Sequence, residues 1–306
     1  MQQCFGAKFK HTPDIIPSYA FKQDFGDCDL LISAAELPPN WREDFAQNMG
    51  SKGWSKNGDV TSIEIQELQF DFISVPLESR QKALTYFAYN DLGNLMGRIA
   101  HKLGFKYGHL GLQKVLRDGD HAYGIVTPTD DVADMFDFLG YDYGRWCQGF
   151  ETLMDIFLFT ASSPYFDSDI YLLHNRNAVS RMRDAKRKTY TDFLEWCKHM
   201  PSRKLYDVNS PERKEKRHAE FMQKAMERWP LFKQQVEEFE ERKRQHEELK
   251  TRWNGDHVNT WTGLQGKSLG EFMAQVKAHK DFSAASRNLD SLKSMTLSLF
   301  EEHRQK

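Results

Sequence analysis

Two aspartates stand one residue apart at the start of a short apolar run. Asp27 and Asp29 flank Cys28, and the run continues through Ser33. Side chains at positions i and i+2 of a strand leave the same face, so a strand here sets the two carboxylates side by side. Two such carboxylates repel each other unless a cation neutralises them. Hard oxygen ligands suit Mg²⁺ or Mn²⁺, and Mg²⁺ also takes phosphate oxygens from a substrate.

A third carboxylate interrupts a later apolar run. Asp71 lies within Leu68-Gln69-Phe70-Asp71-Phe72-Ile73. It either faces solvent from an edge strand or converges on Asp27 and Asp29. Three converging acids can hold two metal ions, one activating an attacking hydroxyl and the other holding a triphosphate and its leaving group. We therefore expect Asp27, Asp29 and Asp71 to be both catalytic and metal-binding residues.

Residues that can contact a nucleotide precede the acid pair. Gly26 permits a tight approach of the backbone, and the hydroxyl of Ser18 and nearby amides can contact β and γ phosphates. Lys22 adds a point charge. Further along, Asn90 and Asn94 share a helix surface on which they could face the base or ribose. Helix packing with polar caps is the other interpretation of these two asparagines.

The acid pattern resembles a known signature. Ser18, the strand start Gly26-Asp27-Cys28-Asp29 and the later Asp71 resemble the polymerase-β nucleotidyltransferase superfamily, which includes CCA-adding enzymes, poly(A) polymerases, terminal uridylyltransferases and aminoglycoside-modifying enzymes. Pro17 stands where that signature has its first glycine. The resemblance implies that Asp27 and Asp29 ligate both metals, and that Asp71 completes the site and helps to activate the acceptor hydroxyl.

A run of cations suggests a second contact surface. On one continuous helix, Arg183, Lys186, Arg187 and Tyr190 would share a face. Such a stripe can follow an RNA backbone, with aromatics available for stacking. It can also bind a triphosphate, and a simply solvated basic helix is an equal alternative.

Lys267 lies in a glycine-rich segment, Thr262–Glu271, near the C-terminal end of the sequence. This segment resembles the Gly-x-x-Leu-Gly turn of tRNA nucleotidyltransferases and poly(A) polymerases, which implies RNA contact. The alternative is ordinary helix capping, because Ser268 and Glu271 have the spacing of a capping box.

These patterns predict an enzyme that transfers a nucleoside monophosphate from an NTP to a hydroxyl and releases pyrophosphate. The expected acceptor is an RNA 3′ end such as that of tRNA. One alternative is the same chemistry on a protein side chain or small molecule, as in toxin-type or antibiotic-modifying relatives. Another is a non-catalytic nucleic-acid-binding protein with the same fold.

The elements that must position these residues change in character near residue 125. Strands are expected at 28–33 and at 62–75, the latter with a turn or bulge near Glu67. A helix is expected at 40–49, and one long helix or two, interrupted around Gly93 and Gly97, at 78–103. Beyond them almost everything is predicted to be helical. Helices are expected at about 130–139, 149–161, 177–199, 212–228, 231–253, 269–279 and 285–302. The fold class is therefore α+β, with an N-terminal nucleotidyltransferase-type mixed sheet in residues 1–125 and a helical domain in residues 126–306.

Composition sets wider bounds. The 306 residues allow two domains, and the formal charge of -2 gives no overall indication of nucleic acid. The cysteines at 4, 28, 147 and 197 are scattered, which favours reduced thiols in the cytoplasm. No apolar stretch has the length of a membrane span, and Met1–Lys10 lacks the apolar core of a signal peptide. The texture of 138–166 resembles nucleotidyltransferase-like proteins of large phages and DNA viruses, which would place the protein in a host cytoplasm.

Overall fold

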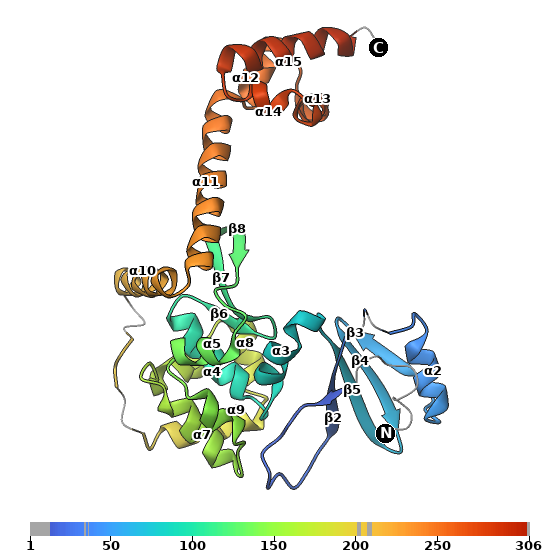
Figure 1. The fold of residues 1–306 in the computed structure, drawn as a ribbon, viewed down its shortest axis with the longest axis vertical. Helices are drawn as coiled ribbons and strands as arrows, with labels where there is room; N and C mark the ends of the chain where they lie inside the picture. Colours follow the sequence, from blue (N-terminus) through green and yellow to red (C-terminus); the bar gives the residue numbers. More distant parts are fainter. Residues whose placement is uncertain (1–12, 34, 36, 201–202, 207–209, 305–306) are drawn as a thin grey trace. The chain divides into compact units, whose positions relative to one another are not determined.

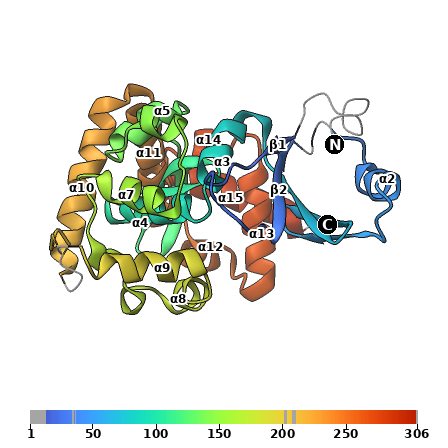
Figure 2. The ribbon, with the colours of Figure 1, turned by 90° about the horizontal axis from the view of Figure 1, so that it is seen from below.

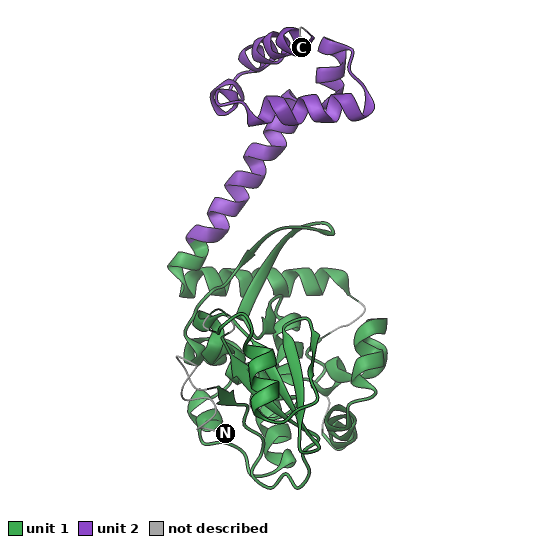
Figure 3. Cartoon of the chain, turned by 90° about the vertical axis from the view of Figure 1, so that its right-hand side faces the viewer, with its two compact units in different colours: residues 1–233 green, residues 234–306 purple. Residues whose placement is uncertain are grey.

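The computed structural model describes residues 13–304, apart from 34, 36, 201–202 and 207–209. The chain forms two compact units, residues 1–233 and 234–306 (Figure 3). These units divide at a different place from the expected boundary at residue 125. The α+β class is confirmed, because a five-stranded mixed sheet in the N-terminal part is followed by mostly helical structure. Cys28, Cys147 and Cys197 are free thiols, whereas Cys4 and segment 1–10 lie outside the described residues.

The N-terminal sheet has the strand order β1-β2-β5-β4-β3 (Figure 1). Its strands are β1 (Asp14–Ile15), β2 (Asp27–Ile32), β3 (Trp54–Asn57), β4 (Val60–Ile65) and β5 (Leu68–Ser74). β2 and β5 run parallel, and the other pairs are antiparallel. The turn expected near Glu67 is confirmed. Gln66 and Glu67 both have left-handed backbone, with φ of 51° and 65°, as a two-residue hairpin turn between twisted strands requires.

The two faces of this sheet pack against different helices, which lie on opposite sides of it (Figure 2). One face contributes Leu30, Phe70 and Phe72 to a core with α2 (Trp41–Asn48). The other contributes Leu31 to a core with α3 (Arg80–Phe87). Side chains alternate between the two faces along a strand. Asp27 and Asp29 are out of phase with Leu30 on β2, and Asp71 is out of phase with Phe72 on β5, so all three aspartates lie on the α3 side.

Residues 77–126 form two helices and a second small sheet. They comprise a 3₁₀ turn (Leu77–Ser79), α3, α4 (Leu92–Lys102), β6 (Lys106–Gly108), β7 (Gly111–Asp118) and β8 (His121–Val126). Two helices cover most of the range expected to hold one long helix or two. The break between them lies at Tyr89 and Asn90, whose φ values are 58° and 63°, and not around Gly93 and Gly97 as expected. The antiparallel β6-β7-β8 sheet was not predicted. Its short, glycine-punctuated runs carry a weak alternation signal.

The rest of the first unit is helical. Its elements are α5 (Val132–Phe138), α6 (Tyr143–Cys147), α7 (Leu153–Ser162), two 3₁₀ turns (Ser168–Tyr171 and Leu173–Asn175), α8 (Ala178–Asp184), α9 (Lys188–Cys197) and α10 (Pro211–Arg228). The expected helix over 177–199 is in fact α8 and α9, separated by residues 185–187. None of the helices in the described residues is both long and apolar enough to cross a membrane.

The second unit has its own core. It contains most of α11 (Pro230–Arg252), then α12 (Gly255–Thr262), α13 (Gly266–Ala278), α14 (Phe282–Ala285) and α15 (Leu289–Arg304). Trp253 and Phe272 are buried in this core, and the Trp253 indole donates to Thr296 at 3.1 Å. The predicted capping box of Ser268 and Glu271 is wrong. α13 starts earlier, at Gly266, so the Ser268 hydroxyl lies inside the helix and donates to the Gln265 carbonyl at 2.8 Å.

The close approach of α3 and α4 yields a test of the fold. A Cβ added at Gly93 would lie 2.0 Å from the Tyr86 carbonyl oxygen, whereas one added at Gly97 would lie 3.6 Å from its nearest neighbour. We expect Gly93→Ala to lower the free energy of unfolding by about 1–3 kcal/mol through overpacking. Gly97→Ala, on the same helix, should be neutral or should stabilise by up to about 1 kcal/mol through helix propensity. Urea denaturation measures both, and equal effects would contradict this packing of α3 against α4.

Candidate functional site

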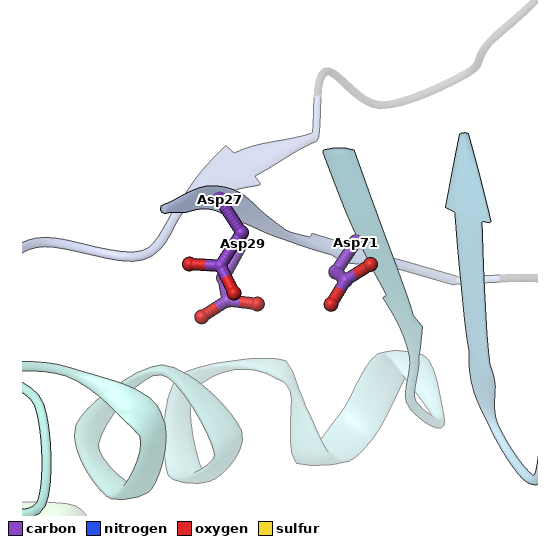
Figure 4. A group of neighbouring side chains, drawn as sticks. All are labelled: Asp27, Asp29 and Asp71. Atoms are coloured by element: carbon purple, nitrogen blue, oxygen red, sulfur yellow. The ribbon is translucent and has the colours of Figure 1, made fainter. Parts of the chain in front are cut away.

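The three predicted aspartates come together. On β2, Asp27 and Asp29 leave the same face, and the parallel register sets Asp29 directly beside Asp71 of β5. One carboxylate oxygen of each residue lies within 4.8 Å of the others. Figure 4 shows the three side chains on the same side of the two strands. The Gln69 amide donates to Asp71 Oδ1 at 2.9 Å and helps to orient it.

The electrostatics of this cluster favour a bound cation. Burial and the charges of Asp27 and Asp71 together raise the pKa of Asp29 to about 6, against the opposing charge of Lys22. Burial and the charges of Asp29 and Asp27 raise the pKa of the Cys28 thiol. A divalent ion would relieve this repulsion, and every donor is a hard carboxylate oxygen. The three residues therefore fit Mg²⁺ or Mn²⁺.

A cavity of about 790 Å³ lies beside the acid pair. Its walls are Asp27 and Asp29 together with residues 15–18, Lys22, Phe25, Cys28, Leu68, Tyr86, Phe87, Asn90, Asp91, Asn94, Arg183, Arg187, Lys188 and Thr189. We call it the first cavity. It brings together most of the residues predicted for the nucleotide and two of those predicted for RNA. Gly26, Asp71 and Lys186 are not among its walls, although Asp71 joins the acid cluster next to it. Lys267 belongs to the second unit, where it lies 3.6 Å from Glu271 on α13.

Backbone hydrogen bonds fix the segment that carries Ser18. Ile16 N–H donates to the Asp29 carbonyl at 3.0 Å, and Ala20 N–H donates to the Phe150 carbonyl at 2.9 Å. The Ser18 hydroxyl donates to Asn90 Oδ1 at 3.2 Å. The segment is thus held between strand β2 and the helical part, and Ser18 is held at the cavity wall.

Asn90 owes its position to strained backbone. It and Tyr89 have left-handed φ, which costs free energy for residues other than glycine. Tyr89 N–H donates to the Pro17 carbonyl at 2.7 Å, and its buried ring packs edge-on against Trp146 and Phe150. These contacts hold the break between α3 and α4 and turn Asn90 towards Ser18.

The basic run does not form the predicted stripe, because the helix breaks after Asp184. Tyr190 is fully buried and donates its hydroxyl to the Tyr171 carbonyl at 2.7 Å, while Lys186 is exposed away from the cavity walls. Arg183, near the end of α8, and Arg187, at the end of the break, instead reach the first cavity. The predicted continuous face of Arg183, Lys186, Arg187 and Tyr190 is therefore absent from the described residues.

Acidic and amide partners aim these two arginines. Arg187 forms an ion pair with Asp91, and Arg183 donates to Asn94 Oδ1 at 3.2 Å and to Asp184 at 3.1 Å. Sequence reasoning missed Asp184, which is fully buried. The sequence feature that could have indicated it is a single acid inside a run of cations, the pattern expected where a buried carboxylate pairs with neighbouring arginines.

No family model and no curated protein matches this chain. The site is therefore interpreted from its own geometry.

Repulsion at Asp29 gives a stability test. Its folded-state pKa of about 6 lies above the ordinary value, so the folded protein binds more protons than the unfolded chain between about pH 4 and 6, and stability falls as pH rises through this window. In EDTA near pH 8, Asp29→Asn should raise the free energy of unfolding by about 1–2 kcal/mol, allowing for solvent screening.

The matched control is Asp24→Asn, which removes an exposed acid from the same segment outside the cluster. It should leave stability unchanged. Adding Mg²⁺ should stabilise the wild-type protein and the control more than Asp29→Asn. Equal responses to Mg²⁺ in all three proteins would show that the cluster does not bind the ion.

Proposed function

We propose that this protein is a metal-dependent nucleotidyltransferase that moves a nucleoside monophosphate from an NTP to a hydroxyl acceptor and releases pyrophosphate. The observation that carries the proposal is the convergence of Asp27, Asp29 and Asp71 beside a cavity whose facing walls are basic. The polymerase-β-type order of these residues along the sequence supports the same reaction.

The first cavity suits a nucleoside triphosphate. Its volume of about 790 Å³ is within the range of small-molecule sites. Lys22, Arg183 and Arg187 supply positive charge for phosphates, and the Ser18 hydroxyl can turn from Asn90 to a phosphate oxygen. Tyr86 and Asn94 offer an aromatic ring and an amide for the base or ribose.

Asp27, Asp29 and Asp71 would hold Mg²⁺ or Mn²⁺, which when bound neutralises phosphate charge and acidifies a coordinated hydroxyl. In the reaction, the acceptor oxygen forms a bond to the α-phosphorus, and the bond from that phosphorus to the bridging oxygen breaks. Pyrophosphate leaves with the electron pair. Asp71, oriented by the Gln69 amide, is the carboxylate that takes the proton of the acceptor hydroxyl. Lys22 and the arginines hold the leaving group in place.

The acceptor we propose is an RNA 3′ end such as that of tRNA, as the resemblance to CCA-adding enzymes and poly(A) polymerases implies. Incubation with labelled NTPs, tRNA and total protein separates this acceptor from a protein or small molecule, because the label then enters different fractions.

The acid cluster predicts the loss of activity. With Mg²⁺ or Mn²⁺, wild-type protein and Asp24→Asn should transfer label from an NTP and release pyrophosphate. Asp29→Asn and Asp71→Asn should do so at least about 100-fold more slowly while remaining folded. Each variant loses a carboxylate ligand of the metal that would stabilise charge on the transferring phosphoryl group. Retained activity in both variants would refute the catalytic role of the acid cluster. An absence of coupled Mg²⁺ and NTP binding by calorimetry would instead favour a non-catalytic binding protein.

The cavity cations predict a selective change in KM. Lys22→Met removes a charge from the cavity wall, so the KM for the NTP should rise about tenfold. Lys186→Met removes a charge from the same basic run that contains Arg183 and Arg187, but Lys186 does not line the cavity. Its KM for the NTP should remain at the wild-type value. An equal rise in both variants would point to general surface charge rather than to triphosphate contact.

A further inference from the structure

A second cavity, of about 400 Å³, adjoins the first along helix α4. The two share Tyr86, Asn94 and Arg183 as wall residues. One face of α4 from Gly93 to Lys102, the start of β6, and residues 175–183 around the start of α8 enclose the second cavity. The two cavities therefore lie next to each other along a single helix.

The second cavity is lined by positive charge. Its cations are Arg98, Lys102, Lys106, Arg176 and Arg183, and no carboxylate is among the wall residues in the described part of the chain. Asp184, buried behind the wall, binds Arg176 at 2.8 Å and 2.5 Å and Arg183 at 3.1 Å. That single acid offsets one of the five positive charges. A net excess of cations faces the cavity.

Two of these cations are fixed by their surroundings, and two are free of ion pairs with the described residues. Arg98 donates to the Ile170 carbonyl at 2.7 Å, and Arg176 is almost fully buried. Lys102 and Lys106 have no ion-pair partner among the residues described. Burial and the charges of Arg98, Arg217 and Lys214 lower the pKa of Lys102, and the charge of Asp167 opposes them in part. Crowded, unpaired cations at a cavity wall are relieved by an anionic ligand.

The reach of α4 favours a strand over a single nucleotide. From Asn94 to Lys102 is eight residues, or about 12 Å along the helix axis. A strand with the stacked geometry of a double helix places a phosphate about every 3.4 Å along its axis, so in that form this distance would span roughly three or four nucleotides. An NTP whose α-phosphate lies beside the aspartates occupies the first cavity, whereas a strand continues into the second.

We propose that the second cavity binds a backbone phosphate of a single-stranded nucleic-acid acceptor, a few nucleotides from its 3′ hydroxyl. Lys102 and Lys106 are the principal contacts, and Arg98 and Arg183 orient the strand between the two cavities. The proposal rests on the proposed function for the identity of the strand as an acceptor, but phosphate binding itself does not require that any reaction occurs.

The test measures the affinity of the full chain for a fluorescent single-stranded RNA oligonucleotide. Fluorescence anisotropy reports the binding, at several salt concentrations and without NTP. Lys102→Gln/Lys106→Gln should weaken binding about tenfold or more and lower the salt slope by about 1.4, since each lost phosphate contact on a single strand contributes about 0.7. The matched control is Lys52→Gln/Lys56→Gln, which also removes two positive charges. Lys56 lies on the edge strand β3 and Lys52 lies just before it, and both are exposed. Its binding should stay within twofold of wild type.

Lys106 is exposed, so Lys106→Gln alone keeps the test valid if the double variant folds poorly. The single variant should lower the salt slope by about half as much as the double variant does. Equal weakening in the control pair would overturn the proposal, because it would show diffuse attraction of the strand to surface charge. Unchanged RNA binding in the Lys102 and Lys106 variants would overturn it as well.

ATP and pyrophosphate binding, measured by calorimetry with Mg²⁺, identifies the source of the phosphate. Both ligands should bind the Lys102→Gln/Lys106→Gln variant as they bind wild type. Weaker ATP binding with unchanged RNA binding would assign the cavity to the nucleotide and overturn the proposal. If the wild-type protein transfers no nucleotide, the proposed function fails, yet the anisotropy result still decides whether the second cavity binds a strand.

Discussion

Repulsion among three carboxylates is the constraint around which the N-terminal part is built. The pairing of β2 with β5 sets Asp29 beside Asp71, and Asp27 follows on the same face. The acids cannot move apart, because the opposite face of both strands is packed into the core with α2. A slip of one residue would turn the acids into that core and Phe72 out of it. The hydrophobic core therefore maintains an electrostatic conflict that a divalent cation would resolve.

The helical part places positive charge opposite this acidic edge. Arg183 and Arg187 reach the first cavity because the chain breaks between α8 and α9, and buried Asp184 fixes the first of them. A second break, at Tyr89 and Asn90, carries backbone strain that the Trp146 and Phe150 rings hold in place. Both breaks depart from regular helix, and both place polar groups at the cavity.

Helix α4 links the two cavities. Its apolar face is buried in the first unit, and its polar face runs from Asn94 at the shared wall to Lys102. Gly93 lets α4 approach the end of α3 closely enough for the Tyr86 ring to line both cavities. One helix thus combines the packing of the fold with a continuous polar track, from the acid cluster to a cluster of cations.

The sequence by itself determined the acid pair, the later Asp71, the hairpin near Glu67 and the α+β class. Each of these depends on local alternation, because a two-residue period fixes which face a side chain leaves. Tertiary structure alone decided that Arg183 and Arg187 reach the site while Lys186 does not, and that Lys102 and Lys106 border a second cavity. Helical periodicity assumed an unbroken helix over 177–199. The break at 185–187 accompanies the burial of Asp184 and Tyr190 against residues distant in sequence, and a local pattern carries no information about such long-range packing.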